Sequence, residues 1–596
     1  MSGCSASFSW AARLRSPSLA ASATWVIAVG LAGQVPDSTA VRDTVQADTT
    51  KPVLLPGLPS QVISGPLPVG SRIVFSPDSL DWLDAETLAD LLLRVPGAFI
   101  ARGGSYGQPE VPMRGGRGAR ALEIFWDGLP LPPIGRDSIY ADATRVPLAF
   151  LERVEVLYRP SSLRIDLVSR RHSARATRSV VRVQRVDNDG AGYRGLLLHR
   201  YASGLGLSVG ADANDTPGST AAGNFQGLDL WFRLEYLPRP GVGAAAQYWL
   251  AATERPGGDL PSGGAIVGRD VTRRYQQLTM FVDRTVDGQG LRVDGIVGST
   301  SSSGDSGVEK ITLRHAALLG AYRRSTWSAS GALRFQSARV PTAVELGLGW
   351  TPVTPLTLAA RFESAHYEGG RSGRRALGSA SLTLPLGFWL RGAVDLGDGP
   401  EAPTLLADTA QPTLDVGAFV GWRARWARLE AGLTRRDAYA PLPPPELDLI
   451  DGLSPSPVSE YGTVQGSISP IGGLTIGGWF EHPLQGGADF APPYHGLATA
   501  SFRSKFWRTF PSGAFDLHLA VQLESWSTGT AGTDASGARI ELPGASFVNV
   551  LAQIEIAGFQ LYWHMRNFSA AEQTFVPGYP YGGALQRFGA LWTFDN

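Results

Sequence analysis

The side chains that could do chemistry are few and are scattered along the 596-residue chain. There are eight histidines and a single cysteine, Cys4. The sequence contains no His-Glu-x-x-His motif, no zinc-type Cys/His cluster and no P-loop, the patterns that mark metalloprotease, structural metal and nucleotide sites. Gly-Ala-Ser-Phe at 544–547 lacks the nucleophile elbow of hydrolases. We therefore predict that the protein is not an enzyme and that it uses no metal and no cofactor.

Ionisable side chains recur instead inside alternating segments. In 515–524, apolar residues alternate with Asp516, His518, Gln522 and Glu524, and the same period of two runs through 228–236, 386–395, 414–423, 559–566 and 588–594. Burying these charges among apolar neighbours in a dry core would be costly. A strand with one face on lipid and the other on a wet lumen removes the conflict. The pattern predicts an all-β transmembrane barrel.

The inward positions of these segments include five carboxylates and two histidines. The carboxylates could pair with Arg114, Arg117 or Arg153 from the N-terminal part, because the arginine fork binds a carboxylate with two hydrogen bonds. We interpret them first as plug-to-wall contacts and second as transport residues; they are Glu235, Asp395, Glu430, Glu524 and Glu555. His518 and His564 fall on the same lumen face. We expect them to be hydrogen-bonded lumen histidines, with a metal or ligand role as the alternative.

Counting such segments from about residue 176 onward predicts about 22 antiparallel strands. Connections after even-numbered strands are short, as at 202–204, 238–241, 351–355, 470–473 and 557–558. Connections after odd-numbered strands are longer, as at 213–226, 253–273, 397–411, 437–459, 527–543 and 569–584. Outer-membrane barrels have this asymmetry between their two ends. The last strand, 585–594, should close the barrel against 179–186, with Phe594 at the short-turn rim.

Composition excludes other classes. The formal net charge is +0, so nothing indicates binding to nucleic acid. No run of 18 apolar residues follows the N-terminus, which disfavours a helical membrane protein. Because Cys4 lies in the expected targeting segment, we predict no disulfide in the mature chain.

The N-terminus has the pattern of a secretory signal peptide over 1–32. Arg13 and Arg15 precede an apolar stretch at 19–31, and cleavage could follow Ala32 or Ala40. A single membrane anchor is the alternative. Residues 33–71 are polar and then Pro-rich, which predicts a periplasmic linker.

Next comes a small α+β segment, expected at 72–171. The apolar positions predict a helix over 85–94, capped by Asp84 and ended by Pro96-Gly97. Strands are expected at 122–126, 150–157 and 162–169, with a tight turn at Asp127-Gly128.

Three motifs in this segment resemble the plug domain of TonB-dependent outer-membrane receptors. They are Leu88–Gly97, then Val111–Gly115 with Ile124–Pro130, and then Leu151–Pro160. The motif positions are Pro96, Gly97, Arg114, Gly115, Asp127, Gly128, Arg153, Glu155 and Pro160, and Trp592 and Phe594 resemble that family's barrel end. The resemblance implies a plug seated inside a barrel that spans 172–596.

The resemblance also implies a function. Such a receptor lies in the cell outer membrane of a Gram-negative-type bacterium, binds a scarce small ligand such as a siderophore-like chelate, cobalamin or an oligomer, and imports it to the periplasm. The partners implied are outer-membrane lipid, TonB, the barrel assembly machinery and the small-molecule ligand. Candidate ligand residues in plug-apex and last-loop positions are Ser105, Tyr106, Gln108, Glu110, Arg136, Asp137, Tyr140, Tyr579 and Tyr581, with ordinary loop packing as the alternative.

The chain departs from the family pattern in four places. Arg159 stands where the family usually has Gly, and the Gly-rich stretch after Pro160 is reduced to 161–165. Residues 52–55 are only a weak candidate for a TonB-binding box, and two residues follow Phe594. A plugged barrel without TonB coupling, acting as a passive pore or a surface structural protein, is the alternative. A barrel enzyme would need a Ser/His/carboxylate cluster, which the sequence does not show.

Overall fold

The computed structural model describes Leu55 and residues 66–595, except 84, 103–109, 116, 134–138, 142, 188, 217–224, 256–257, 260–264, 267–268, 305–309, 404, 446, 448, 570–573, 577–578 and 581–583. The expected signal peptide and most of the expected linker lie outside these residues. Among the described residues, no helix is long and apolar enough to cross a bilayer.

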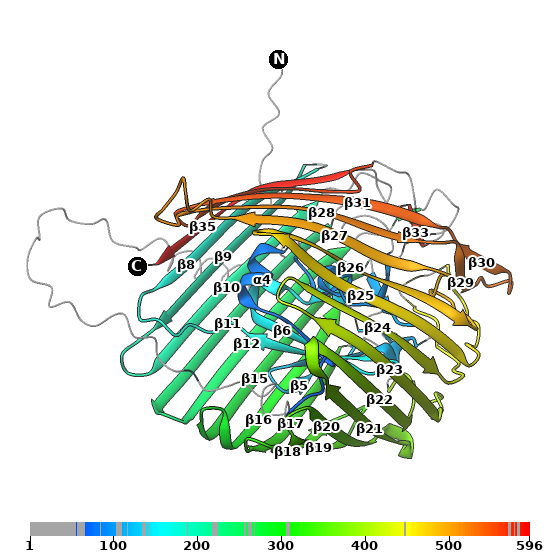
Figure 1. The fold of residues 1–596 in the computed structure, drawn as a ribbon. Coiled ribbons are helices and arrows are strands. Elements are labelled where there is room, and N and C mark those ends of the chain that lie inside the picture. The colour runs from blue at the N-terminus through cyan, green and yellow to red at the C-terminus, as the bar shows by residue number, and fades with distance from the viewer. Residues whose placement is uncertain are drawn as a thin grey trace, which may run out of the picture. The chain divides into compact units, whose positions relative to one another are not determined.

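Twenty-two antiparallel strands form one closed barrel, which Figure 1 shows as tilted arrows around the N-terminal segment. The strands are β8(Arg178–Val186), β9(Gly190–Arg200), β10(Leu205–Thr216), β11(Phe225–Arg239), β12(Val242–Arg255), β15(Arg269–Val286), β16(Gln289–Gly304), β17(Ile311–Arg323), β18(Trp327–Gln336), β19(Thr342–Val353), β20(Leu356–His366), β21(Ser372–Thr383), β22(Phe388–Asp398), β23(Thr413–Arg423), β24(Ala427–Arg436), β25(Ser459–Ile471), β26(Leu474–Gln485), β27(His495–Ser504), β28(Phe515–Trp526), β31(Ala545–Ile556), β32(Phe559–Arg566) and β35(Leu585–Asp595). The predicted strand number and direction are confirmed.

The barrel closes between its last and first strands. Phe594 lies opposite Ser179, and Arg587 lies opposite Val186, as the sequence predicts. Closure leaves no free sheet edge, so every strand has two hydrogen-bonded neighbours.

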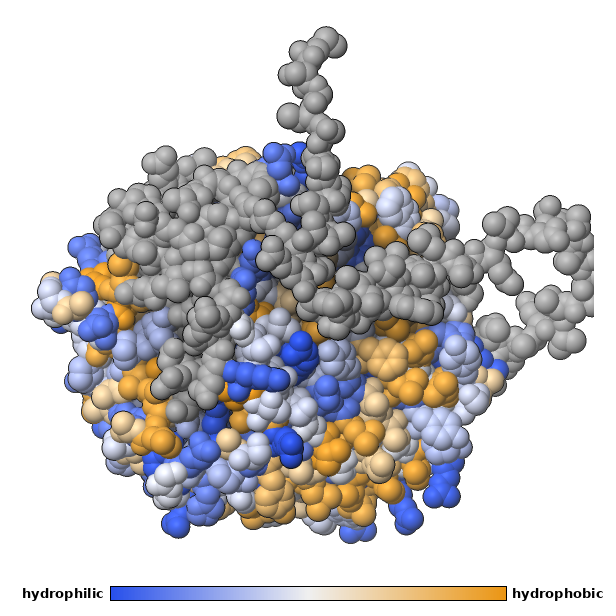
Figure 2. Space-filling model, turned by 180° about the vertical axis from the view of Figure 1, so that it is seen from behind, coloured by the Kyte–Doolittle hydropathy of each residue, from blue (hydrophilic) through white to orange (hydrophobic). Residues whose placement is uncertain are grey.

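The two faces of the wall differ as the alternation predicts. In β28, Leu519, Val521 and Leu523 are exposed on the outer face, whereas His518 and Glu524 are buried on the lumen face. Figure 2 shows apolar side chains, in orange, spread over one side of the molecule. A wall with an apolar exterior and a polar interior suits a barrel in lipid.

The connections also separate into two classes. Some connections have only two residues; they follow β11, β15, β19, β25 and β31. Others are long, such as residues 437–458 between β24 and β25. We call the two ends of the barrel the short-turn end and the long-loop end. Residues 505–514, after β27, are the longest connection at the short-turn end. Small hairpins decorate the long loops: β13(Gly258–Asp259) with β14(Ala265–Ile266), β29(Gly529–Thr533) with β30(Arg539–Leu542), and β33(Thr574–Val576) with β34(Tyr579–Pro580).

The N-terminal segment forms a small α+β unit, here called the plug. Its five-stranded sheet has the order β1(Arg72–Phe75), β6(Leu151–Tyr158), β7(Leu163–Ser169), β4(Leu122–Trp126) and β5(Leu129–Pro130). A hairpin of β2(Phe99–Arg102) and β3(Glu110–Met113), the helices α4(Pro77–Trp82) and α5(Leu88–Leu92), and the 3-10 turns Ala119–Ala121, Ala143–Arg145 and Leu148–Phe150 complete it.

The main plug helix is shorter than predicted, and the predicted cap is wrong. Helix α5 begins at Leu88, and its N-cap is Thr87, whose hydroxyl accepts from the Asp90 amide while the Asp90 carboxylate accepts from the Thr87 amide. This reciprocal pair satisfies two amides that a helix start leaves free. Leu88, Leu91 and Leu92 are buried, as the spacing predicts.

Candidate functional site

Ion pairs hold the plug against the barrel wall on several sides. Arg117 donates to Asp415 at 2.6 Å, Arg164 to Glu345 at 3.0 Å and Arg159 to Glu363 at 2.7 Å. Wall arginines reach plug carboxylates in Arg182–Glu86, Arg587–Glu86, Arg233–Asp127, Arg375–Glu123, Arg566–Asp90 and Arg503–Asp78. The plug is therefore fastened to strands all around the barrel.

The predicted partners of the lumen carboxylates are wrong. Glu235 pairs with Arg200, Asp395 with Arg375, Glu430 with Arg391 and Glu524 with His495, all within the wall. The partners lie one or two strands apart in the wall, so the shorter contact is within the sheet.

The plug arginines named in that prediction bind elsewhere. Arg153 pairs with Glu152 and Glu155 of its own strand, and Arg114 donates to the Pro96 carbonyl at 3.2 Å. Of the three, Arg117 makes a plug-to-wall ion pair, but with Asp415.

The two lumen histidines are hydrogen-bonded, which agrees with the simpler expectation. His518 Nδ1 lies 2.9 Å from Gln553 Oε1, and Arg587 donates to His564 Nδ1 at 2.9 Å. No group of three or more His, Cys, Asp or Glu among the described residues could hold a metal ion.

Several plug-motif residues shape turns and contacts. Asp127 and Gly128 both have positive φ, 44° and 90°, which makes the tight turn after β4. The Asp127 carboxylate accepts from the Ser169 amide and from Arg233 of the wall. Gly115 has φ 43°, and a Cβ at this position would collide with Arg436. Arg436 also donates to the Pro160 carbonyl at 3.4 Å.

The glycine predicted to end the plug helix and the two aromatic residues of the barrel end are also in the structure. Gly97 has φ 74° beside Glu481, where a Cβ would collide with that carboxylate. Trp592 and Phe594 are 39% and 47% exposed on the outer face of β35, where lipid-facing aromatic residues belong.

The candidate ligand residues are described only in part. Glu110 begins β3 and pairs with Arg102 at 3.4 Å. Tyr140 is buried, and its hydroxyl donates to the Leu442 carbonyl at 2.8 Å. Tyr579 lies in β34, and its side chain is outside the described part. Ser105, Tyr106, Gln108, Arg136, Asp137 and Tyr581 lie outside the described residues, so their ligand role stays a prediction.

A cavity of about 310 Å³ lies at the long-loop end, between the plug and strands β17–β22. We call it the outer cavity. Its walls combine apolar residues such as Phe125, Leu131 and Ile139 with charged groups including Glu123 and Arg375. Ligand sites of this size commonly join apolar walls to a few polar groups.

Beside the outer cavity, long loops pack onto the plug apex. Phe99 contacts Phe490 and Trp526 with ring centroids 6.1 and 5.4 Å apart, and Leu447 and Ile450 join the same buried cluster. These contacts cover the apex toward strands β24–β31.

A buried carboxylate joins three segments at this end. Glu401 accepts from the Ala119 amide of the plug and from the Leu442 amide of a long loop, both at 2.7 Å. Burial raises the pKa of Glu401 to about 7, although these two amides oppose the shift. Plug residue Glu86 behaves differently. Burial alone would raise its pKa, but the nearby guanidinium groups of Arg182 and Arg587 hold the pKa well below its ordinary range.

A family model identifies the plug. The model of the TonB-dependent receptor plug domain matches residues 69–166. The chain has a TonB-dependent receptor plug inside a 22-strand barrel. A search of curated protein sequences finds no significant match.

Solved structures of a siderophore receptor, a ferric enterobactin receptor and an iron transporter share the fold over most of the chain. The siderophore receptor PirA from Acinetobacter baumannii superposes with a TM-score of 0.67 at 12% identity, over 88% of this chain and 98% of that one. A Pseudomonas aeruginosa ferric enterobactin receptor, PfeA, solved in complex with enterobactin, gives 0.66 at 11% identity, over 88% and 99%. The FrpB iron transporter from Neisseria meningitidis gives 0.67 at 10% identity, over 88% and 99%. At sequence identities of 10–12%, this structural similarity shows a shared fold alone.

Sequence reasoning missed the ion pairs formed by Arg159. Arg159 donates to Glu123 of the plug at 2.8 Å and to Glu363 of β20 at 2.7 Å. The sequence offered one indication of this role: Arg159 stands where the plug motif usually has glycine.

Proposed function

We propose that this protein is an outer-membrane receptor that binds a scarce small ligand at the cell surface and imports it to the periplasm. The observation that supports this most is the complete plug, fastened inside the closed barrel by buried ion pairs. A wall with an apolar exterior suits the outer membrane, and the expected signal peptide would export the chain. TonB in the periplasm is the proposed energy-coupling partner, and the barrel assembly machinery is the proposed insertion partner.

The outer cavity supports a small-molecule ligand. Its volume of about 310 Å³ is in the range of small-molecule sites and far below what a folded protein needs. The solved structures of similar fold include a siderophore receptor, a receptor with bound enterobactin and an iron transporter. A siderophore-like chelate is therefore our first choice, before cobalamin or an oligomer. Glu110, Tyr140 and the other apex and last-loop residues named above remain the proposed contacts.

A passive pore or surface structural protein is the second candidate. The weak match of residues 52–55 to a coupling box favours it. A closed plug argues against constant conductance, whereas lost coupling would leave a receptor that binds without import.

Uptake distinguishes the two candidates. Cells that make the protein would be given iron-55 chelates of catecholate and hydroxamate type, or labelled cobalamin, with and without a protonophore. Import predicts accumulation that the protonophore abolishes and that deletion of 33–65 also abolishes. The deletion keeps residues 66–70, because the Val69 amide donates to Ser381 of the wall at 3.0 Å.

A scrambled 52–55 sequence is the matched control for linker length. Uptake that survives both the deletion and the protonophore would contradict coupled import. Binding without accumulation, or steady conductance of the purified protein in planar bilayers, would support the second candidate.

A further inference from the structure

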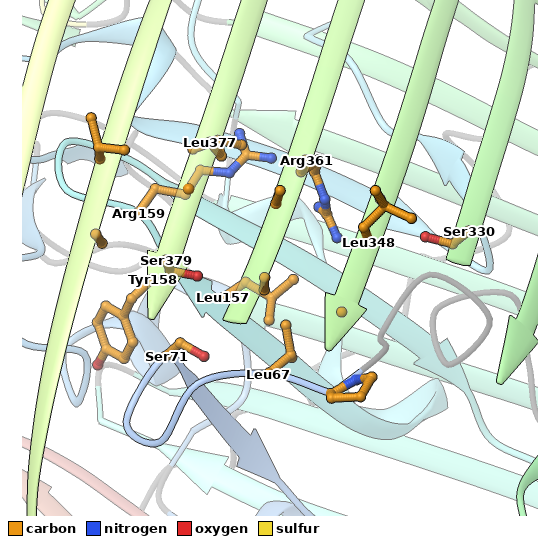
Figure 3. Close-up of a pocket in the computed structure, with 18 of the residues that line it drawn as sticks. Leu67, Ser71, Leu157, Tyr158, Arg159, Ser330, Leu348, Arg361, Leu377 and Ser379 are labelled. Carbon is orange, nitrogen blue, oxygen red and sulfur yellow. The ribbon is translucent and has the colours of Figure 1, made fainter. Parts of the chain in front are cut away.

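Two cavities lie along the same part of the barrel wall, one toward each end. The outer cavity touches strands β17–β22 at the long-loop end. A smaller cavity, of about 90 Å³, lies between plug residues 157–160 and strands β18–β22, beside residues 66–71. Figure 3 shows this inner cavity, with Leu157 and Arg159 of the plug facing Ser379 and Arg361 of the wall.

An ion-pair network separates the two cavities. Arg159 bridges Glu123 and Glu363 at 2.8 and 2.7 Å, and Arg375 of β21 bridges Glu123 and Asp395, both at 2.7 Å. Glu123, Glu363 and Arg375 line the outer cavity, whereas Arg159 lines the inner one. The network is thus the partition between them.

The acidic side of this network is partly exposed to the outer cavity. The side chains of Glu123 and Glu363 are 32% and 21% exposed, whereas that of Arg159 is 5% exposed. The neighbouring pair Arg164–Glu345 is almost fully buried. Hydrated ion pairs cost less to separate than buried ones, because water replaces the lost partner. The partition can therefore open at Glu123 and Glu363 first.

Small side chains leave room on the wall below the partition. The lumen-facing residues that line the inner cavity include Ser328, Ser330, Gly347, Gly349 and Ser379. Small residues on a barrel interior create space that larger side chains would fill. The wall here can admit solute after only a modest shift of the plug.

Another part of the wall, strands β11 to β15, fastens the plug by aromatic rings, here called the aromatic anchor. Trp126 lies 4.9 Å from Trp249 and 5.5 Å from Tyr275, and Phe150 stacks on Trp231 at 5.4 Å. All five rings are nearly inaccessible to solvent. Separating them would expose large apolar surfaces, which costs far more than parting hydrated charges.

We propose that solute crosses this barrel between the plug and strands β18–β22, and that Arg159, Glu123, Glu363 and Arg375 are the gate on that route. The proposal rests on the import function above. The aromatic anchor stays in place while the plug separates from strands β18–β22. Arg159, which replaces the family's usual glycine, gives this chain a gate residue of its own.

A third cavity marks the competing route. It has a volume of about 590 Å³ at the short-turn end, beside strands β8, β9, β31, β32 and β35. Glu86, held by Arg182 and Arg587, lines it. Opening on this side would break those pairs instead.

Single-channel conductance in planar bilayers tests the gate without a ligand or a coupling partner. The wild type is expected to be closed. Glu123→Gln with Glu363→Gln should raise conductance several-fold, and Arg159→Gln should do the same. The matched control, Glu86→Gln with Asp78→Asn, removes two plug-to-wall carboxylates at the other wall and should stay closed. Wild-type conductance in both gate variants, or opening of the control alone, would overturn the proposal.

Cysteine modification locates the current path in the open gate variant. With Cys4→Ser as background, Ser330→Cys and Ser379→Cys should lose most of their current after a charged methanethiosulfonate reagent. Gln247→Cys, on the aromatic-anchor wall, and Gln553→Cys, in the third cavity, should keep theirs. The reverse pattern would refute the route. Heat-modifiable migration on gels confirms that each variant barrel is folded.

The same measurements separate failure of the route from failure of the proposed function. A wild type that already conducts contradicts a closed receptor, yet the cysteine pattern still decides whether ions follow this wall. A closed wild type that opens in the control variant keeps the receptor function and refutes the route.

Discussion

Asp595 accepts two hydrogen bonds from Arg178, at 2.9 and 3.1 Å, across the seam between the last and first strands of the barrel. Asp595 is one of the two residues that extend the chain past the terminal Phe594. The extension therefore adds an ion pair to the point where the barrel closes, and it leaves Phe594 opposite Ser179.

Asp595→Asn should weaken this seam slightly. Both side chains are about half exposed, so the pair is worth about 1 kcal/mol or less and should fade at high salt. Heat-modifiable gel migration should shift to a slightly lower temperature in dilute buffer and not in 1 M salt. Asp189→Asn, which breaks the exposed Arg185–Asp189 pair at the β8–β9 turn without a contact across to β35, is the control. A shift that is unchanged by salt would exclude an electrostatic cause.

Trp126→Ala should loosen the plug without opening the barrel. Removing a fully buried indole costs about 3–5 kcal/mol, because its contacts with Trp249 and Tyr275 are lost. Trypsin should cut the plug at lower urea concentration, while the barrel keeps its heat-modifiable migration. Trp350→Ala, on the exposed outer face, should leave the urea midpoint unchanged. Equal midpoints for Trp126→Ala and the wild type would contradict the role of the aromatic anchor.

Glu345→Gln should destabilise the plug more than a wall-only change. Glu345 accepts from Arg164 of the plug and from Arg334, and Arg361 pairs with it at 3.4 Å, so its loss leaves three largely buried cations undercompensated, at about 3–5 kcal/mol. The same urea and protease assay measures this. Glu235→Gln, which breaks pairs with Arg200 and Arg233 inside the wall, is the control. If both variants release the plug equally, the Arg164–Glu345 pair has no special role in seating it.

The contact of Glu401 with the plug should depend on pH. Its folded pKa, about 7, lies above the ordinary value of 4.5, so the folded protein holds a proton that the unfolded chain releases between those values. Its contribution to stability is therefore fully present below about pH 4.5 and is lost as pH rises through 7, by up to about 3 kcal/mol.

Hydrogen exchange at pH 5 and pH 8, corrected for intrinsic rates, measures this change at the amides of Ala119 and Leu442. Glu401→Gln cannot titrate and should remove the difference between the two pH values, although its one carbonyl oxygen accepts from only one of the two amides. Asp408 and Arg120 also face this carboxylate, so Asp408→Asn is the control for a neighbouring charge. A pH difference that persists in Glu401→Gln would assign the effect elsewhere.

The alternation of side chains predicts the barrel well for a physical reason. Each strand must present one apolar and one polar face, so the period of two marks the strand directly in the sequence. The same rule places Trp592 outward and Arg587 inward, and this sets the register of β35 against β8.

Contacts across the lumen could not be predicted in this way. Whether Glu235 meets a plug arginine or Arg200 of β9, two strands along the wall, depends on distances that no local pattern encodes. The start of α5 was missed because the Thr87–Asp90 pair competes with Asp84 as a cap signal. Arg159 was visible as a departure from a family motif, but its partners Glu123 and Glu363 lie 36 and 204 residues away in sequence.

The aromatic anchor has an optical consequence. The indoles of Trp126 and Trp249 have centroids 4.9 Å apart and are tilted by 49°, one on the plug and one on the wall. The strong indole transition dipoles at that separation and angle couple, which is expected to give paired bands of opposite sign in the far-ultraviolet circular dichroism. The protein therefore contains its own spectroscopic reporter: the paired bands persist while the plug turns about this contact and vanish when the plug leaves the barrel.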